Sequence, residues 1–148
     1  MRVALDAARN SIASGDIPVG AAIFNNKGEV VAIGHNEREL HNDPTAHAEI
    51  VAIRRAAEKL GDWHLTDHTL VVTLEPCAMC AGAMVLARLP RLVYATTDPK
   101  AGAGGSIMDI TQHPALNHQV DVSHGLFADE ASEQIRSFFR MLRARGEK

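Results

Sequence analysis

His47 and Glu49 lie two residues apart, and Cys77 and Cys80 lie three apart in a chain that has no other cysteine. Thiolate sulfur and imidazole nitrogen are donors that zinc prefers in proteins. Two thiolates and one imidazole leave a fourth coordination position for water, which is typical of a catalytic rather than a structural zinc site. The residue types therefore predict one zinc ion per chain, held by His47, Cys77 and Cys80.

Glu49 is the candidate general acid and base of this site. A carboxylate beside a zinc-bound hydroxide can take a proton from the water and deliver it to a substrate nitrogen, and later to a leaving amine. Residues two apart do not share a helix face, so His47 and Glu49 can converge only if both lie in the first turn of a helix. The pair thus predicts hydrolytic chemistry in which Glu49 moves the protons.

Each of the two motifs is weak when taken alone. A Cys-x-x-Cys pair is more often a redox pair or half of a structural zinc site, and most His-x-Glu pairs occur by chance. Here an apolar run leads directly into Pro-Cys-Ala-Met-Cys (residues 76–80), about thirty residues after His47. A helix that begins at this proline would favour thiolate over thiol at its N-terminus. The combination predicts a catalytic metal site.

The elements that must position these residues follow from the apolar pattern. Strands are predicted at residues 17–25, 29–36, 69–74, 92–96 and 120–127. Helices are predicted at residues 2–14, 45–60, 76–89 and 129–145, with a shorter one at 106–112 and a glycine-rich loop at 98–105. The turn at 26–28 makes the first two strands an antiparallel hairpin, and the remaining strands are expected to be mostly parallel. The pattern predicts a three-layer α/β/α sandwich around a mixed sheet of about five strands, in a single domain spanning residues 1–148.

Composition narrows the class of protein. The chain is 46% hydrophobic, which is ordinary for one buried core, and it lacks both a long apolar stretch and an N-terminal signal pattern. We therefore expect a cytoplasmic protein with no membrane partner. A formal charge of −3 disfavours strong non-specific binding to nucleic acid. The last twelve residues nevertheless form a basic tail, with Glu147 opposed by Arg140, Arg143, Arg145 and Lys148.

The motifs resemble those of the zinc-dependent cytidine and deoxycytidylate deaminase superfamily. The segments that carry the resemblance are IPVGAAI, GHNERE, DPTAHAEI and TLEPCAMCAGAM, in this order. The resemblance implies a cytidine deaminase-like fold, zinc on one histidine and two cysteines, attack by a zinc-bound hydroxide, and Glu49 as the proton shuttle. Three further segments are similar to the tRNA-specific adenosine deaminases of bacteria: DPKAGAGGSIMDI (98–110), HPALNH (113–118) and FFR (138–140).

The second resemblance implies hydrolytic deamination of adenosine to inosine at the wobble position of an anticodon, with an arginine tRNA as partner and a homodimer as the assembly. An anticodon loop exposes unpaired bases, which is the form in which proteins usually read RNA sequence. For the helix that carries Phe138 and Phe139, we expect one ring buried and one partly exposed. The substrate contacts that the resemblance implies are Asn36, Arg38, Asp98, Lys100, Phe139 and Arg143.

Three other functions share part of this pattern. An enzyme acting on a free nucleobase or nucleotide, such as guanine or cytosine, would use the same catalytic residues, but it would need neither the glycine-rich loop nor the basic tail. A non-catalytic, zinc-stabilised binding subunit would typically lack the glutamate, which is present here as Glu49. A thiol redox protein would explain Cys77 and Cys80 but not His47 and Glu49.

Overall fold

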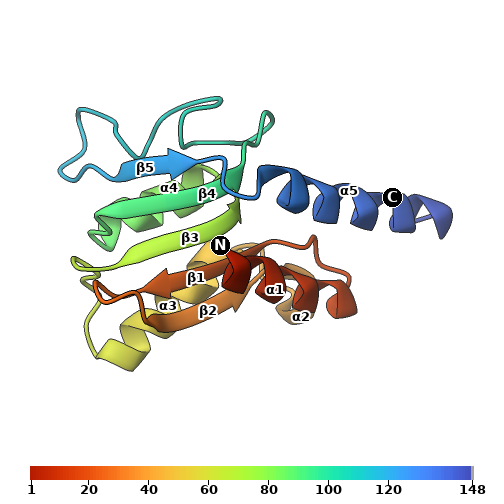
Figure 1. Cartoon of the computed structure of the whole chain (residues 1–148), viewed down its shortest axis with the longest axis horizontal. Coiled ribbons are helices and arrows are strands. Elements are labelled where there is room, and N and C mark those ends of the chain that lie inside the picture. Colours follow the sequence, from red (N-terminus) through yellow and green to blue (C-terminus); the bar gives the residue numbers. More distant parts are fainter. Residues whose placement is uncertain (148) are drawn as a thin grey trace.

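Five strands form one sheet in the order β2-β1-β3-β4-β5, in a computed structural model that describes residues 1–147 (Figure 1). The strands are β1 (Gly20–Phe24), β2 (Val30–His35), β3 (Thr69–Leu74), β4 (Arg91–Thr96) and β5 (Asp121–His124). β1 runs antiparallel to both β2 and β3, whereas β3, β4 and β5 are parallel to one another. The predicted mixed sheet is therefore confirmed. Lys148, the last residue of the predicted domain and of the basic tail, lies outside the described residues.

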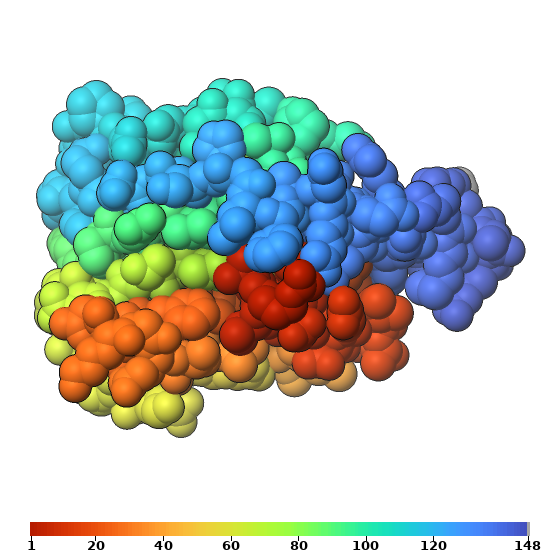
Figure 2. Space-filling model, viewed as in Figure 1, coloured from red at the N-terminus to blue at the C-terminus, as the bar shows by residue number. Residues whose placement is uncertain are grey.

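Helices cover both faces of the sheet. They are α1 (Arg2–Asn10), continued by the short 3-10 helix η1 (Ser11–Ser14), α2 (Arg38–His41), α3 (Ala48–Leu60), α4 (Ala78–Leu86) and α5 (Ala128–Ala144). α1 and α5 lie on one face, and α3 and α4 lie on the other (Figure 1), which confirms the three-layer sandwich. The C-terminal half of α5 extends beyond the edge of the sheet and projects from the body of the molecule (Figure 2).

The main core lies between the sheet and the pair α3 and α4. Leu70, Val72, Leu92 and Met84 are fully buried there. β3 is buried along all four of its central residues, as expected for a strand that is covered on both faces. A smaller cluster of Leu5, Ala95 and Ala131 seals the opposite face. β3, whose C-terminal end leads to Cys77, is thus anchored in the core.

Two glycines allow helix backbones to approach the sheet closely. A Cβ atom on Gly20 would lie 1.9 Å from the carbonyl oxygen of Ala4 in α1, and one on Gly34 would lie 2.5 Å from that of Ala48 in α3. Both distances are far below a van der Waals contact, so only glycine fits at either position. The contact at Gly34 matters for the site, because it holds the first turn of α3 directly against β2.

Residues 106–112 do not form the predicted helix. They form turns, with an isolated bridge between Gly104 and Asp109. The Asp109 side chain accepts hydrogen bonds from the Gln112 N–H (3.0 Å) and the Thr111 hydroxyl (2.6 Å). Such local bonds give the backbone an alternative to the helical pattern.

The short helix α2 was not predicted. Its four residues are too few to show an apolar period, and its stability comes from a distant residue. The buried carboxylate of Asp16 accepts hydrogen bonds from the N–H groups of Glu39 (2.7 Å) and Leu40 (3.2 Å). None of the helices among residues 1–147 has the length and apolarity required to cross a bilayer.

Candidate active site

His47 and Glu49 both lie at the start of α3, as the sequence predicts. His47 is the N-cap residue with an extended backbone (φ −68°, ψ 153°), and Glu49 lies in the first turn. The preceding turn is fixed by Asp43, whose carboxylate accepts hydrogen bonds of 2.8 Å from the N–H and the hydroxyl of Thr45. The chain therefore enters α3 in a defined direction, and the imidazole and the carboxylate reach around the same helix end.

Cys77 is the N-cap residue of α4, and Cys80 lies in its first turn. β3 ends two residues before Pro76, so the C-terminal edge of the sheet delivers both cysteines. Among residues 1–147, no side-chain cap hydrogen bond is made by either His47 or Cys77. The first-turn N–H groups of two helices thus contribute a positive field at the same place, which favours bound anions and thiolates.

The three predicted ligands are brought together. The Sγ atoms of Cys77 and Cys80 each lie 3.6 Å from His47 Nδ1, and one donor atom from each residue lies within 4.8 Å of the others. A tetrahedral ion with metal–sulfur bonds of about 2.3 Å and a metal–nitrogen bond of about 2.0 Å holds sulfur and nitrogen about 3.5 Å apart. The donor set therefore fits a metal ion in both chemistry and spacing.

The two thiols differ in acidity because they interact. The hydrogen bond from the Cys80 side chain has the largest effect on Cys77. Together with a second bond from His47, it lowers the pKa of Cys77 to about 3. The same Cys77–Cys80 contact, together with burial, raises the pKa of Cys80. The hydrogen bond to Cys77 raises the pKa of His47. One thiolate is thus already stable without a metal, and a cation that replaced the shared protons would stabilise the second.

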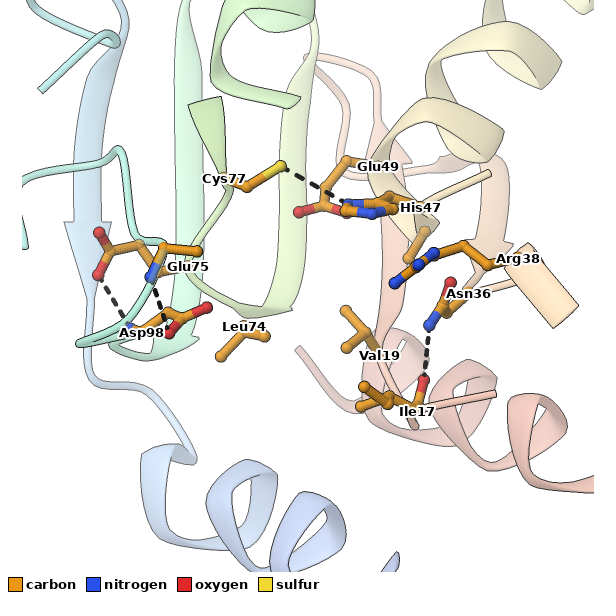
Figure 3. Close-up of a pocket in the computed structure, with 12 residues that line it drawn as sticks. Ile17, Val19, Asn36, Arg38, His47, Glu49, Leu74, Glu75, Cys77 and Asp98 are labelled. Atoms are coloured by element: carbon orange, nitrogen blue, oxygen red, sulfur yellow. Dashed lines mark hydrogen bonds between the residues drawn. The ribbon is translucent and has the colours of Figure 1, made fainter. Parts of the chain in front are cut away.

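Glu49 is a buried carboxyl group with 4% of its surface exposed. Burial disfavours its charged form and raises its pKa to about 7. A carboxyl group with a pKa near neutrality can both accept and donate a proton at the working pH of most enzymes. Its side chain points toward His47 and Cys77 (Figure 3), so the site combines a metal donor set with a group suited to proton transfer.

A pocket opens over these groups at the C-terminal edge of the sheet (Figure 3). Its polar lining includes Asn36, Arg38 and Asp98, three of the predicted substrate contacts. The rest of the lining comprises Ile17, Val19, His47, Ala48, Glu49, Leu74, Glu75, Cys77 and Ala101. The apolar side chains provide walls for a flat ring, and the polar groups converge near the metal donors.

Asn36 carries an unpaired polar atom in this pocket. Its Nδ2 donates a hydrogen bond of 3.2 Å to the carbonyl oxygen of Ile17, which orients the amide. Its Oδ1 is buried and has no hydrogen-bond partner within the described chain. A buried acceptor without a partner costs free energy, so this oxygen fits a ligand that brings an N–H or O–H donor.

The other three predicted contacts lie in a depression beside α5. Lys100, Phe139 and Arg143 line it together with Ile135, Arg136 and Arg140. An intermediate hollow shares Asp98 and Leu74 with the pocket, and Lys100 and Phe139 with the depression. The two areas therefore form one continuous surface. As predicted, one ring of the Phe pair is buried (Phe138, 2% exposed) and the other is partly exposed (Phe139, 37%).

Two residues of this surface were missed by the sequence analysis. Arg136 lines the depression, and its spacing of seven residues from Arg143 could have revealed it, because this spacing places both on one helix face. Arg140, by contrast, is paired with the carboxylate of Glu133. Glu75 lines the pocket but carries no recognisable pattern apart from its position just before the Pro-Cys motif.

Comparisons with known proteins agree with this geometry. The MafB19-like deaminase family model matches residues 1–143. The tRNA-specific adenosine deaminase of Bacillus subtilis (strain 168) is 42% identical over 143 residues, which are 97% of this chain and 88% of that protein. The enzyme of the same name from Haemophilus influenzae is 41% identical over 97% of this chain and 83% of its own length.

Solved structures of two kinds of deaminase resemble this chain to different degrees. A structure from work on A-to-I editing by tRNA:A34 deaminases at the wobble position of transfer RNA has a TM-score of 0.87 and 42% identity, over 90% of this chain and 96% of that chain. A guanine deaminase from Nitrosomonas europaea has a TM-score of 0.78 and 28% identity, over 91% of this chain and 80% of that chain. The described chain is thus more similar to the tRNA:A34 deaminase than to this free-base enzyme.

Proposed function

The chain belongs to the MafB19-like deaminase family, and on that premise we propose that it is a zinc-dependent hydrolase that converts adenosine to inosine at the wobble position of a tRNA anticodon. One observation carries this proposal. A metal donor set and a buried carboxyl group lie in a pocket that continues into a basic, aromatic surface on α5. A free base would fill only the pocket, whereas an RNA loop would use the whole surface. We also propose a cytoplasmic location, because the enzyme would meet its tRNA substrate there.

His47, Cys77 and Cys80 hold the zinc ion in this proposal. When bound there, zinc supplies a Lewis acid that makes water nucleophilic at neutral pH. Glu49 would accept a proton from the attacking water and donate it to the ring nitrogen next to the carbon that bears the amino group. It would then take a second proton from the hydroxyl formed on that carbon and give it to the amino group, which leaves as ammonia. Its pKa of about 7 suits this exchange. The apolar walls of the pocket exclude other water from the reacting carbon.

Asn36 and Arg38 bind the nucleotide in this proposal. The Asn36 amide is held by Ile17, so its free Oδ1 offers an acceptor to a donor of the nucleotide at a fixed position. Arg38 adds a positive charge at the rim of the pocket. Asp98, Lys100, Phe139 and Arg143 then contact the neighbouring nucleotides, through hydrogen bonds, charge and stacking.

The proposed reaction is tested by incubating the zinc-loaded protein with an arginine tRNA that has adenosine at the wobble position. Nucleoside analysis measures inosine, and free adenosine, adenine, guanine and cytosine are assayed in parallel. We expect inosine only in the tRNA. Turnover of a free base beside unchanged tRNA would reject the RNA substrate and retain the zinc chemistry.

Removing the charges of Arg136 and Arg143 together should weaken tRNA binding by about tenfold at physiological salt, since each contributes to counterion release. The slope of log Kd against log salt should decrease by the amount that two phosphate contacts contribute. Arg91→Ala is the control, because Arg91 is exposed and begins β4, at the end of the strand opposite the pocket. Filter binding across a salt series measures both quantities, and an unchanged slope would place the RNA elsewhere.

We further propose that the chain forms a homodimer through the outer faces of α3 and α4. Leu86 (71% exposed) and Trp63 (58% exposed) present large apolar surfaces there. They flank a groove lined by Ile50, Ile53, Arg54, Ala57, Ala83 and Ala87. A second copy, as the resemblance implies, would cover apolar area that is costly to leave in water. The two helices that carry the metal donors would then also form the interface.

Leu86→Asp is expected to convert the dimer to a monomer, because it places an unpaired charge in the interface. Light scattering coupled to size exclusion at micromolar concentration measures the mass. Leu40→Asp is the control, since Leu40 is also exposed but lies on α2. A wild-type mass of 16.0 kDa, that of one chain, would reject the dimer.

A further inference from the structure

We propose that Glu75 is a positioning residue: its buried carboxylate is the template around which the substrate-binding loop of residues 98–106 folds. The inference rests on the proposed function, because it assigns this loop to the tRNA contacts. Glu75 directly follows β3, and only 2% of its surface is exposed. Its own N–H donates a hydrogen bond of 2.9 Å to the carbonyl oxygen of Thr96 at the end of β4. The side chain thus starts from a rigid point between two parallel strands.

Four hydrogen bonds from this loop hold the Glu75 carboxylate, which also interacts with the Tyr94 side chain of β4. Oε1 accepts from the N–H of Asp98 (3.2 Å) and from the hydroxyl of Ser106. Oε2 accepts from the N–H groups of Gly104 and Ser106, both at 3.2 Å. The donors come from both ends of the loop. A buried carboxylate is stable only when it is paired or fully hydrogen-bonded, and here the loop backbone supplies most of the bonds.

The loop sequence is shaped to wrap this carboxylate. A Cβ atom on Gly102 would lie 2.1 Å from Glu75 Oε2, so no larger residue fits while the carboxylate is in place. A Cβ atom on Gly104 would lie 3.3 Å from the Tyr94 ring and 3.5 Å from Glu75 Cγ. The N–H of Ala103 donates a hydrogen bond of 2.8 Å to the carbonyl oxygen of Pro76. The small residues of the loop are therefore explained by its close approach to Glu75.

The loop held in this way presents two of the proposed substrate contacts. Asp98 and Ala101 line the pocket. The Asp98 carboxylate accepts hydrogen bonds from the N–H groups of Lys100 (2.9 Å) and Ala101 (3.3 Å), and Lys100 lies in the depression beside α5. A chain of hydrogen bonds thus runs from Glu75 through Asp98 to Lys100 (Figure 3 shows the first of these). Glu75 sets the position of both contacts without needing to touch the substrate.

Glu75→Gln is the decisive variant. Both carboxylate oxygens of Glu75 accept hydrogen bonds, so the NH2 group of glutamine would face N–H or O–H donors and could not replace the bonds that one oxygen makes. In the zinc-loaded full chain, hydrogen exchange of the Asp98, Gly104 and Ser106 amides should accelerate by about tenfold or more. KM for an anticodon stem-loop should rise by about tenfold to a hundredfold, with kcat within about threefold. The zinc content should equal that of the wild type. Glu29→Gln, an exposed glutamate in the hairpin turn, is the control.

Ser106→Ala is a second variant, which keeps the carboxylate and removes only the hydroxyl donor. It should change the exchange rates and KM in the same direction by a smaller factor, and it tests the proposal if Glu75→Gln does not fold. Unchanged exchange at the three amides, or an unchanged KM with faster exchange, would overturn the proposal. A fall in kcat with KM unchanged would overturn it too, since Glu75 would then act on the chemical step. If exchange is faster in the variant but the wild-type protein leaves tRNA unmodified, the result rejects the proposed function and not the positioning role of Glu75.

Discussion

Replacing Glu49 with glutamine is expected to lower kcat by at least about a hundredfold, and by as much as about 10⁴-fold, because an amide cannot shuttle a proton. Glutamine nearly preserves the shape of the side chain, so metal content and tRNA affinity should stay close to those of the wild type. Single-turnover assays of inosine formation, with metal analysis of the same samples, measure both effects. Turnover near the wild-type level would reject Glu49 as the proton shuttle.

The same substitution should alter how stability depends on pH. Burial raises the pKa of Glu49 from 4.5 to about 7, so the unfolded chain ionises this group at lower pH than the folded chain does. The metal-free wild type should therefore lose stability as pH rises from 4.5 to about 7, through the cost of ionising a buried group. The glutamine variant lacks this loss. Urea unfolding with chelator at pH 5 and pH 7 compares them, and an equal pH dependence would show that Glu49 is not buried in this way.

Replacing Cys77 with alanine is expected to abolish tight zinc binding and all detectable turnover. Zinc at a thousandfold excess over its Kd stabilises the folded state by about 4 kcal/mol, and for a chain of this size such a loss lowers Tm by roughly 10 °C. Calorimetry with zinc present measures the shift. Measurements with chelator form the control, because the variant and the wild type should then differ much less.

Cys77→Ser separates metal loss from capping. Serine is a weak zinc ligand but a strong N-cap residue, so it should lose zinc as alanine does and yet support α4 by about 1 kcal/mol more in chelator. Zinc binding at wild-type affinity in the alanine variant would contradict the assignment of Cys77 as a ligand.

Much of the architecture is predictable because the strands that carry it are buried. The apolar run at residues 69–74 has the same bounds as β3, and this strand is covered on both faces. The bounds of the edge strand β5 were predicted less well. The strand expected over residues 120–127 is limited to Asp121–His124, since it is an edge strand with mostly exposed side chains and little burial to mark its ends.

The two helix errors both involve a carboxylate that binds backbone N–H groups. Asp16 supports α2 from more than twenty residues away. At residues 106–112, Glu75 binds the Ser106 N–H and Asp109 binds the Gln112 N–H, so turns form instead of a helix. Local helix propensity does not predict which residues will form such bonds. Side chains that chemistry dictates, His47, Glu49, Cys77 and Cys80, were found by type and spacing. Glu75 was not, because its partners are backbone N–H groups that any sequence carries.

His47 and Cys77 occupy positions where most helices place Ser, Thr, Asp or Asn. In evolutionary terms, a single substitution at either position would create an ordinary N-cap residue. A descendant with aspartate or serine at either position would gain a capping bond as it lost a metal donor, so its fold would be buffered against the loss of catalysis. Loss of the metal donor at either position would therefore remove the chemistry while the helix end that carried it became better capped.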